Sequence, residues 1–430
     1  MQTFFSPEQR ADPSLGASQQ IIRKCVRCGF CTATCPTYVL LGDELDSPRG
    51  RIYLIKDMLE NDRTPTAEVV KHIDRCLSCL SCMTTCPSGV NYMHLIDNAR
   101  AYIESRYQRP LLDRALRAVL AWTLPHPRRF RIAITLARLA RPFAGLLERL
   151  RPLKPLAAML RLAPNRPRSS AKVARAAASG QRRGRVALLQ GCVEPVLRPS
   201  IQAATVRLLT RVGYDVVAAK GEGCCGALEL HLGREHSAMD AARRNVDAWI
   251  REVETSGLDA IVITAAGCGT TIKDYGFMLR TDPAYAEKAA RVSALARDIT
   301  ELLENADLPK SAPKSLAVTY HAACSLQHGQ KVTAAPKKLL AAAGFTIREA
   351  AEGHLCCGSA GTYNMLQPDI ATQLRDRKLK NIDVTKPDVI VTGNIGCATQ
   401  LASGTNVPIV HTVEMLDWAT GGPKPDALER

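Results

Sequence analysis

The stretch CVRCGFCTATCP, residues 25–36, places four cysteines at the spacing C-x2-C-x2-C-x3-C and follows the last one with a proline. The same pattern returns in CLSCLSCMTTCP, residues 76–87. This spacing lets three neighbouring thiolates surround one iron–sulfur cluster, while the fourth cysteine reaches a second cluster. Two complete copies therefore predict two [4Fe-4S] clusters. Paired zinc sites or unrelated buried thiols are the weaker alternatives.

The crossed sharing of the fourth cysteine assigns the ligands of both clusters. The first cluster is expected on Cys25, Cys28, Cys31 and Cys86. The second cluster is expected on Cys76, Cys79, Cys82 and Cys35. The residues between the runs include the helical patterns SPRGRIYLIKDMLEN and AEVVKHIDR, so residues 21–105 are predicted to form a ferredoxin-like domain of the helical type. Residues 1–20 are expected to be a flexible N-terminal lead.

The remaining eight cysteines lie in an internal repeat with copies at 186–312 and 313–430. Strand patterns such as DAIVITAAGC and DVIVTGNIGC alternate with amphipathic helices, which predicts a parallel α/β arrangement in each copy. Functional groups gather at the carboxyl ends of parallel strands, so the four thiols of each copy should meet at one edge. The two sets are Cys192, Cys224, Cys225 and Cys268, and Cys324, Cys356, Cys357 and Cys397. The fold class expected is α+β and multidomain, with a helical dicluster domain followed by two α/β repeats packed as a pseudo-symmetric pair.

Each repeat contains an adjacent cysteine pair followed by glycine, the CCG motif. Gly223, Gly226 and Gly358 are expected to relax the backbone so that two neighbouring thiols can face one site. Spacing alone leaves open whether each set holds a further iron–sulfur cluster, a zinc ion or no metal. His321, His328 and His354 lie near the second set, as structural hydrogen-bonding groups or as ligands or proton carriers. No G-x-G-x-x-G follows a strand and no nucleophile–histidine arrangement stands out, so no catalytic residue is predicted.

The net charge of +16 comes from one segment. Residues 106–185 contain 20 Lys and Arg residues and only two acidic ones, Asp113 and Glu148. The sequence RFRIAITLARLARPFAGLLERLRPL predicts helices with an apolar stripe and an arginine face, in a basic helical linker. This linker could cover the core, lie on anionic lipid within reach of quinone, or dock on an acidic partner. Nucleic acid is not an expected partner, because the charge is confined to one segment and only 5% of the residues are aromatic.

The cysteine content and the N-terminal sequence indicate the cellular compartment in which the protein is expected. The sequence MQTFFSPEQR has no basic region followed by an apolar core, so no signal peptide is predicted. No transmembrane helix is predicted either. A cytoplasmic location is therefore expected, where clustered cysteines usually serve metal or redox chemistry.

Two ferredoxin-type runs followed by two CCG repeats resemble the family of glycolate oxidase iron–sulfur subunits, over nearly the whole chain. The resemblance is carried by CGFCTATCPTY, LGDELDSPRGRIYLIK, RCLSCLSCMTTCPSGV, GCCGALELHL, HLCCGSAGTYN and NIGCATQLASG. It implies an electron-transfer subunit of an oxidoreductase acting on CH–OH donors. FAD-containing partner subunits would oxidise glycolate to glyoxylate, and this chain would pass the electrons to quinone or another acceptor. It also implies a peripheral position on the inner face of the cytoplasmic membrane.

The resemblance also implies alternative functions for the chain. Related subunits serve lactate or glycerol-3-phosphate dehydrogenases, and CCG repeats occur in thiol–disulfide reductases. In the reductase branch a further cysteine follows each repeat's last one at C-x2-C and completes a five-cysteine noncubane cluster. Thr271 and Gln400 occupy those positions here, so each repeat offers four thiols and fits a conventional cluster better. A zinc-bearing scaffold that only organises partners is the remaining alternative.

Overall fold

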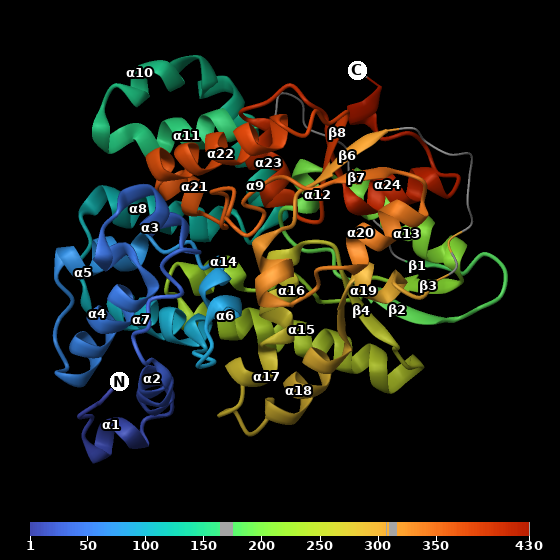
Figure 1. Ribbon diagram of the computed structural model, residues 1–430. Helices are drawn as coiled ribbons and strands as arrows, with labels where there is room; N and C mark the ends of the chain where they lie inside the picture. The colour runs from blue at the N-terminus through green and yellow to red at the C-terminus, as the bar shows by residue number, and fades with distance from the viewer. Residues whose placement is uncertain (164–174, 307, 309–315, 430) are drawn as a thin grey trace.

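The computed structural model describes residues 1–163, 175–306, 308 and 316–429 (Figure 1). Its described residues form a helical N-terminal unit, a run of helices from the basic segment, and two small sheets that are each flanked by helices. The expected order of a helical unit followed by two α/β units is confirmed. The boundary expected between residues 312 and 313, and residues 164–174 of the basic segment, lie outside the described residues.

The N-terminal unit is built from short helices around an apolar core. They are α1 (Pro7–Ala11), α2 (Pro13–Lys24), α3 (Pro36–Leu41), η1 (Glu44–Asp46), α4 (Pro48–Glu60), α5 (Ala67–Asp74), α6 (Ser81–Thr85) and α7 (Tyr92–Arg106). Apolar stripes of α2, α4, α5 and α7 meet at Ile22, Ile55, Ile73 and Leu95, all fully buried. This burial, rather than the propensity of such short helices, stabilises the unit.

Within the expected flexible lead, residues 7–11 form α1 and residues 13–20 belong to α2. Ser6 caps α1 by accepting a hydrogen bond from the Gln9 backbone, and Asp12 caps α2 in the same way. Phe5 is buried in the core of the unit. Capping and burial together order this segment, and neither is apparent from its polar composition.

The start of α4 fixes the segment between the two cysteine runs. Ser47 Oγ accepts a hydrogen bond from the Gly50 backbone at 3.0 Å, and Pro48 occupies the first turn of the helix. A Cβ atom at Gly50 would lie 2.0 Å from the Glu44 carbonyl oxygen. Only glycine therefore lets α4 pack this closely on η1.

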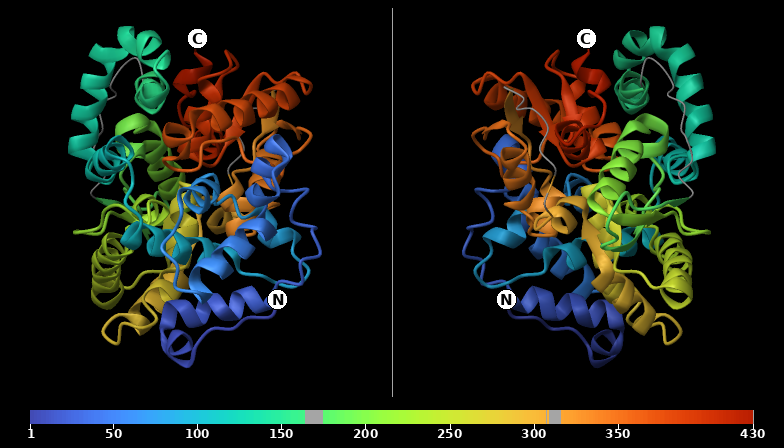
Figure 2. Two further views of the ribbon diagram at one scale, coloured as in Figure 1. Left: turned by 90° about the vertical axis from the view of Figure 1, so that its left-hand side faces the viewer. Right: turned by 90° about the vertical axis from the view of Figure 1, so that its right-hand side faces the viewer.

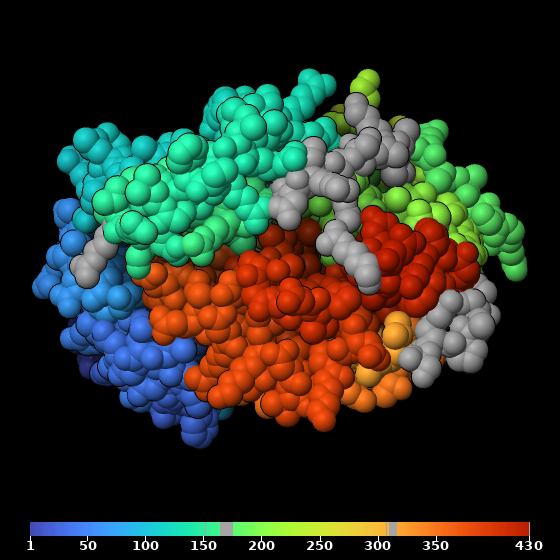
Figure 3. Space-filling model, turned by 90° about the horizontal axis from the view of Figure 1, so that it is seen from above, coloured from blue at the N-terminus to red at the C-terminus, as the bar shows by residue number. Residues whose placement is uncertain are grey.

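The basic segment forms helices that are repeatedly interrupted by proline. They are α8 (Leu111–Thr123), α9 (Pro127–Ala140), η2 (Arg141–Phe143), α10 (Ala144–Glu148), η3 (Arg151–Leu153) and α11 (Lys154–Leu162). Figure 3 shows this segment (green) as a ridge that runs from the N-terminal unit across the second repeat (orange and red). Its helices therefore form an outer layer over the rest of the chain.

The first repeat contains a sheet with the order β1-β3-β2-β4-β5, in which only β1 runs antiparallel to its neighbour. Its strands are β1 (Arg175–Ala176), β2 (Gly184–Leu188), β3 (Tyr214–Val217), β4 (Ala260–Ile263) and β5 (Ala296–Asp298). Its helices are α12 (Glu194–Leu197), α13 (Ser200–Val212), α14 (Ala227–His231), α15 (Glu235–Ser256), α16 (Ala266–Lys273), α17 (Tyr275–Met278), α18 (Ala286–Leu295) and α19 (Ile299–Leu303).

The second repeat contains a fully parallel sheet with the corresponding order β7-β6-β8-β9. Its strands are β6 (Ala317–Tyr320), β7 (Thr346–Arg348), β8 (Val389–Thr392) and β9 (Ile409–His411). Its helices are the π-helical turn η4 (Ser325–Gly329), α20 (Ala335–Ala342), α21 (Tyr363–Leu366), α22 (Pro368–Asp383), α23 (Ile395–Ala402), α24 (Thr412–Ala419) and η5 (Asp426–Leu428).

The two repeats share one hydrophobic core. Leu188 and Val262 of the first sheet belong to the same buried cluster as Val318 and Val391 of the second. Helices α13 and α24 pack against each other within this core. Strands β2, β4 and β8 are buried along their whole length, as expected for parallel sheets covered on both faces. The predicted pseudo-symmetric packing is thus confirmed.

The N-terminal unit packs against both repeats (Figure 2). His94 Nε2 lies 2.8 Å from Asp274 Oδ1 of the first repeat, and the His94 ring stacks on Phe277 with centroids 3.5 Å apart. Thr84 Oγ1 lies 2.8 Å from His328 Nδ1 of the second repeat. These contacts hold the two cysteine runs against the strand ends that carry the CCG cysteines.

Candidate metal centres

The first ferredoxin-type set lies near the surface. Cys25, Cys28, Cys31 and Cys86 line one hollow, as the crossed ligand assignment requires, and Cys82 reaches its inner wall. Arg27 and Gly29 have positive φ, which folds the loop so that its thiols face inward. Cys28 is exposed and Cys25 is buried. Burial, with the nearby Cys25 and Cys35 charges, raises the pKa of Cys31 to about 11, so a bound cation would be needed to hold its thiolate.

The second ferredoxin-type set is fully buried. Its members are Cys35, Cys76, Cys79 and Cys82. Cys35 stands at the start of α3, and the positive φ of Ser78 and Leu80 turns the chain sharply between the other three. Burial raises the pKa of Cys79 and Cys82, and neighbouring thiolates raise it further. Four buried thiols in this position fit a metal cluster, whose positive charge stabilises thiolates.

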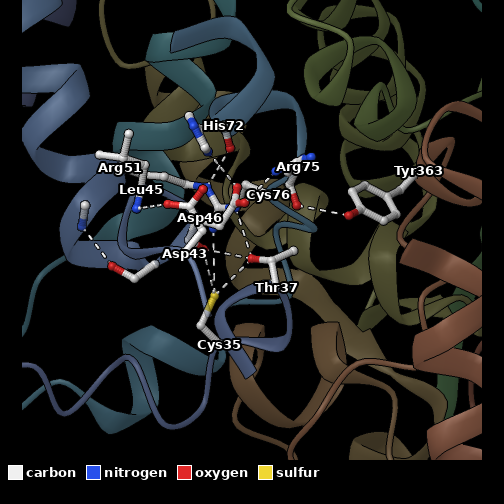
Figure 4. A network of polar contacts seen from close by, with 12 residues as sticks. Cys35, Thr37, Asp43, Leu45, Asp46, Arg51, His72, Arg75, Cys76 and Tyr363 are labelled. Atoms are coloured by element: carbon white, nitrogen blue, oxygen red, sulfur yellow. Dashed lines mark hydrogen bonds and ion pairs between the residues drawn. The ribbon is translucent and has the colours of Figure 1, made fainter. Parts of the chain in front are cut away.

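A buried ionic network supports the second set (Figure 4). Arg51 is 1% exposed and donates to Thr37, Asp46 and the His72 carbonyl oxygen. Its Nη1 lies 3.8 Å from Cys35 Sγ. Asp46 also contacts the His72 ring and Arg75, so both of its carboxylate oxygens have partners. The sequence analysis did not identify this network, although Asp46 and Arg51 lie within the stretch LGDELDSPRGRIYLIK.

The first CCG set gathers Cys192, Cys224, Cys225 and Cys268 at the carboxyl ends of β2 and β4. The Cys224 thiol interacts with both Cys192 and Cys225, and Cys225 interacts with Cys268. Hydrogen bonds from Cys192 and Cys225 lower the pKa of Cys224, whereas Cys192 and Cys225 have raised pKa values. Asn245 and Tyr275 bind the carbonyl oxygens of Cys224 and Cys225 and hold the pair in place.

The second CCG set gathers Cys324, Cys356, Cys357 and Cys397 in the corresponding position. Cys324 Sγ lies 3.7 Å from Cys356 Sγ, and Cys357 interacts with Cys356 and Cys397. The predicted convergence of four thiols is therefore present in both repeats. Gln400, in the position of the further cysteine of the reductase branch, donates instead to the Ala371 carbonyl oxygen.

The glycine that follows each pair is the one the structure requires. Gly226 and Gly358 both have a φ of 87°. A Cβ atom would lie 2.9 Å from the Ala238 carbonyl oxygen at Gly226, and 2.4 Å from the Ala371 carbonyl oxygen at Gly358. The leading Gly223 has an ordinary φ and open space around it. The expected role in relaxing the backbone is thus supported for Gly226 and Gly358, and Gly223 is not needed for it.

The three histidines near the second set lie in different environments. His328 bonds Thr84 and the His354 carbonyl oxygen, so it is a structural residue at the contact with the N-terminal unit. His354 is only partly buried. His321 is 4% exposed, and its ring lies with Cys357 and Cys397 in a group whose donor atoms are all within 4.8 Å of one another.

The second ferredoxin-type set and the second CCG set are in direct contact. Cys79, Cys356 and Cys324 belong to one apolar cluster together with Leu77 and Tyr363. Burial raises the pKa of Cys79, and the charge of Cys324 raises it further. Thiols from two distant parts of the sequence thus pack in one apolar cluster.

A cavity of about 550 Å³ joins the two CCG sets. Seven of their eight cysteines line it: Cys192, Cys224, Cys225, Cys268, Cys324, Cys356 and Cys397. The opposite wall consists of apolar side chains from α8, α9 and α11, including Ile134 and Leu160. Buried Oε1 of Glu194 and Oδ1 of Asn364, both on lining residues, have no hydrogen-bond partner among the described residues. The cavity therefore has an apolar wall facing a wall that carries thiols and unpaired oxygens.

The outer face of helices α8, α9, η2 and α10 is exposed and apolar. Ten of the sixteen large exposed hydrophobic side chains in the described residues belong to this patch, called here the α8–α10 patch: Leu111, Leu112, Val119, Trp122, Ile132, Leu136, Leu139, Phe143, Leu146 and Leu150. Exposed arginines surround it, namely Arg114, Arg128, Arg131, Arg141 and Arg149. Val119 and Leu136 also line the cavity, so the cavity reaches the patch. Within the described ranges, no helix combines the length and the apolar character needed to cross a bilayer.

Comparisons with known proteins match both halves of the chain. A family model described as a 4Fe-4S dicluster domain matches residues 21–90, and one described as a cysteine-rich domain matches residues 186–273 and 318–402. A glycolate oxidase iron-sulfur subunit of Escherichia coli is 44% identical over 97% of this chain and 99% of its own length. A probable glycolate oxidase iron-sulfur subunit of Bacillus subtilis is 32% identical over 92% of this chain and 94% of its own.

A solved structure shares the fold. The crystal structure of a hypothetical protein from Helicobacter pylori superposes with a TM-score of 0.55 at 10% identity, covering 97% of this chain and 74% of that one. Sequence similarity over almost the full length of this chain and of both relatives is sufficient for assignment. The chain belongs to the family of glycolate oxidase iron–sulfur subunits.

Proposed function

We propose that this chain is the electron-transfer subunit of a flavin-dependent oxidoreductase that acts on the CH–OH group of glycolate. FAD-containing partner subunits would oxidise glycolate to glyoxylate, and electrons would pass through this chain to a quinone-type acceptor. The proposed ligands are Cys25, Cys28, Cys31 and Cys86 for one [4Fe-4S] cluster and Cys76, Cys79, Cys82 and Cys35 for the other. Such clusters supply one-electron carriers that couple a two-electron flavin to an acceptor. The proposed units are residues 21–105, 106–185, 186–312 and 313–430.

The contact between Cys79 and the second CCG set carries this proposal. It gives a buried path from the N-terminal unit into the repeats, because Cys79, Cys324 and Cys356 pack in one cluster. The path begins at the exposed Cys28 and ends at the cavity between the CCG sets. A scaffold that only organised partners would not need its thiol sets in contact across two domains.

The surface around the first set is suited to a protein partner. Val26 and Phe30 are 68% and 62% exposed, and Tyr53 is 49% exposed with Arg27 stacked over its ring. Exposed aromatic and arginine side chains of this kind are typical of protein interfaces. A flavin-bearing subunit docked here would place its cofactor beside the most exposed thiol set.

The α8–α10 patch supports a peripheral position on the inner face of the cytoplasmic membrane. Ten large apolar side chains exceed what a helix layer that merely covers the core would expose. Arginines beside the patch would be attracted to anionic lipid, at roughly 1 kcal/mol for each residue near the surface. The cavity that opens at Val119 and Leu136 would admit an apolar acceptor from the bilayer to the CCG thiols.

The test separates electron delivery from substrate oxidation in the anaerobically purified complex. Cys28→Ser is expected to abolish quinone reduction while glycolate still reduces the flavin of the partner subunit in stopped-flow absorbance measurements. Thr32→Ser in the same loop is the control and should retain both activities. Loss of flavin reduction in Cys28→Ser would contradict the relay role.

The metal content gives a second measurement. Two cubane clusters correspond to about eight irons per chain, and each further cubane on a CCG set adds about four. Iron, zinc and sulfide analysis of the anaerobic complex therefore reports how many CCG sets hold clusters. A protein without iron after anaerobic purification would refute the proposal.

A further inference from the structure

The two CCG sets occupy equivalent positions but have different neighbours. The residue three before the first cysteine is Leu189 in one repeat and His321 in the other. The Leu189 backbone N–H donates to the Val262 carbonyl oxygen at 3.0 Å, and the His321 backbone N–H donates to the Val391 carbonyl oxygen at 2.8 Å. The two residues thus make the same contact between corresponding strands. Leucine and histidine are structural equivalents here.

A second position differs in the same direction. Ala265 and Asn394 each stand three residues before the last cysteine, at the start of α16 and α23. The Asn394 Nδ2 donates to Cys397 Sγ at 3.3 Å, whereas alanine can make no such bond. The second set therefore has polar neighbours at two positions where the first set has apolar ones.

His321 is buried without a partner for one ring nitrogen. The residue is 4% exposed, and its Nε2 has no hydrogen-bond partner within the described part of the chain. An unpaired buried polar atom is unfavourable, and most buried polar atoms in native proteins have a partner. The same ring has a nitrogen within 4.8 Å of the sulfur atoms of Cys357 and Cys397.

We propose that the second CCG set binds its metal through the imidazole ring of His321 together with the thiolates of Cys357 and Cys397. One of Cys324 and Cys356, whose sulfur atoms are 3.7 Å apart, supplies the fourth position. The bound metal is iron or zinc, because both accept a mixture of imidazole and thiolate donors. The first set has Leu189 in the equivalent place, so any metal it binds is held by thiolates alone. This assignment concerns metal coordination and does not depend on the direction of electron flow.

The proposed ligands also determine the net charge of each centre. Imidazole binds a metal as a neutral ligand, whereas each thiolate adds a negative charge. Lys378 is 3% exposed, and its Nζ donates to the Glu352 carbonyl oxygen at 2.6 Å near the second set. A centre with three thiolates and a neutral imidazole is less negative than one with four thiolates. If it holds iron, it takes up an electron more readily than the first.

The experiment identifies a nitrogen ligand directly in the anaerobically purified complex. Protein is prepared with ¹⁵N-labelled histidine. If the second set holds iron, pulsed electron paramagnetic resonance is expected to detect a strongly coupled histidine nitrogen. If it holds zinc, X-ray absorption at the zinc edge is expected to show a nitrogen neighbour beside sulfur. Coordination by sulfur alone in the wild-type protein, or no metal at this set, would overturn the proposal.

Variants assign that signal to one residue. His321→Leu, which copies the first repeat, should lose the nitrogen signal and leave this set with thiolate coordination only. His321→Cys should retain metal with sulfur coordination, which distinguishes a lost ligand from damaged packing. His328→Gln is the matched control and should keep the signal, because His328 bonds Thr84 and the His354 carbonyl oxygen. A nitrogen signal that persists in both His321 variants would show that another residue is the ligand.

Discussion

The guanidinium of Arg51 lies 3.8 Å from Cys35 Sγ and is almost completely buried. The charge is paired with Asp46 at 3.2 Å and directed at the thiol set by a hydrogen bond to Thr37. Burial alone would lower the pKa of Arg51, but the neighbouring charges, led by Cys76, raise it above its usual value. A permanent positive charge therefore lies beside the second ferredoxin-type set.

Replacing Arg51 should lower the reduction potential of the centre on Cys35, Cys76, Cys79 and Cys82. A positive charge favours the more negative, reduced state, and a differential interaction of about 1.4 kcal/mol corresponds to roughly 59 mV for a one-electron couple. Arg51→Gln should show this decrease in a redox titration followed by electron paramagnetic resonance, whereas Arg51→Lys should retain most of the potential. Equal potentials in Gln and Lys variants that are both folded would contradict an electrostatic role.

The glycine after each cysteine pair should resist substitution. Gly358→Ala and Gly226→Ala combine a positive φ with a backbone clash, so each should cost about 1–3 kcal/mol and lower the thermal unfolding midpoint. Gly358→Ala should be the more damaging, because its Cβ would lie closer to a helix carbonyl oxygen. Gly223→Ala, in open space within the same motif, should change the midpoint little. A midpoint for Gly223→Ala as low as that of its neighbours would argue against this account.

The α8–α10 patch should bind vesicles that contain anionic lipid. Ile132→Asp and Leu139→Asp each remove an exposed apolar side chain, so each should weaken binding about tenfold in co-sedimentation. Val384→Asp is the control, because Val384 is 78% exposed and lies outside the patch. High salt should weaken binding further, because the arginine contribution is screened. Unchanged vesicle binding in the Ile132 and Leu139 variants would show that the α8–α10 patch is not the lipid-binding surface.

Acidification should weaken the contact between the two repeats through His411. Its Nε2 lies 3.0 Å from the Thr264 carbonyl oxygen, and its Nδ1 accepts from the Val413 backbone, so the neutral ring is the one that fits. Burial lowers the pKa of His411 to about 4. The unfolded chain then takes up the proton first, so this stability is complete above about pH 6.5 and falls as the pH approaches 4.

The expected loss at His411 is about 1.4 kcal/mol between pH 7.5 and pH 5.5. His411→Gln can still donate to Thr264 but does not titrate in this range. Its thermal unfolding midpoint should therefore depend less on pH than that of the wild type. Parallel pH profiles for the two proteins would assign the effect to other groups.

The sequence predicted much of this molecule because its signals are local. The spacing of the cysteine runs and the positions of Cys192 and Cys268 after buried strands can be recognised without a structure, and the repeat revealed the paired architecture. The short strands β5 and β9 were not predicted, since three residues give no periodicity. Arg51, Asn394 and the Cys79 contact were missed because they depend on which distant segments meet. His321 was noted in the sequence. That it replaces Leu189 of the first repeat is established only by the matching backbone hydrogen bonds of the two residues.

The core that the two repeats share has an evolutionary consequence. Leu188, Val262, Val318 and Val391 are buried against each other's halves, so loss of either copy would leave the other with an exposed apolar face. A gene that arose by duplication could therefore not discard one half without losing the whole protein. The two halves therefore share one folding requirement, while their strand-end residues differ. Leu189 and His321, Ala265 and Asn394 are the record of that divergence.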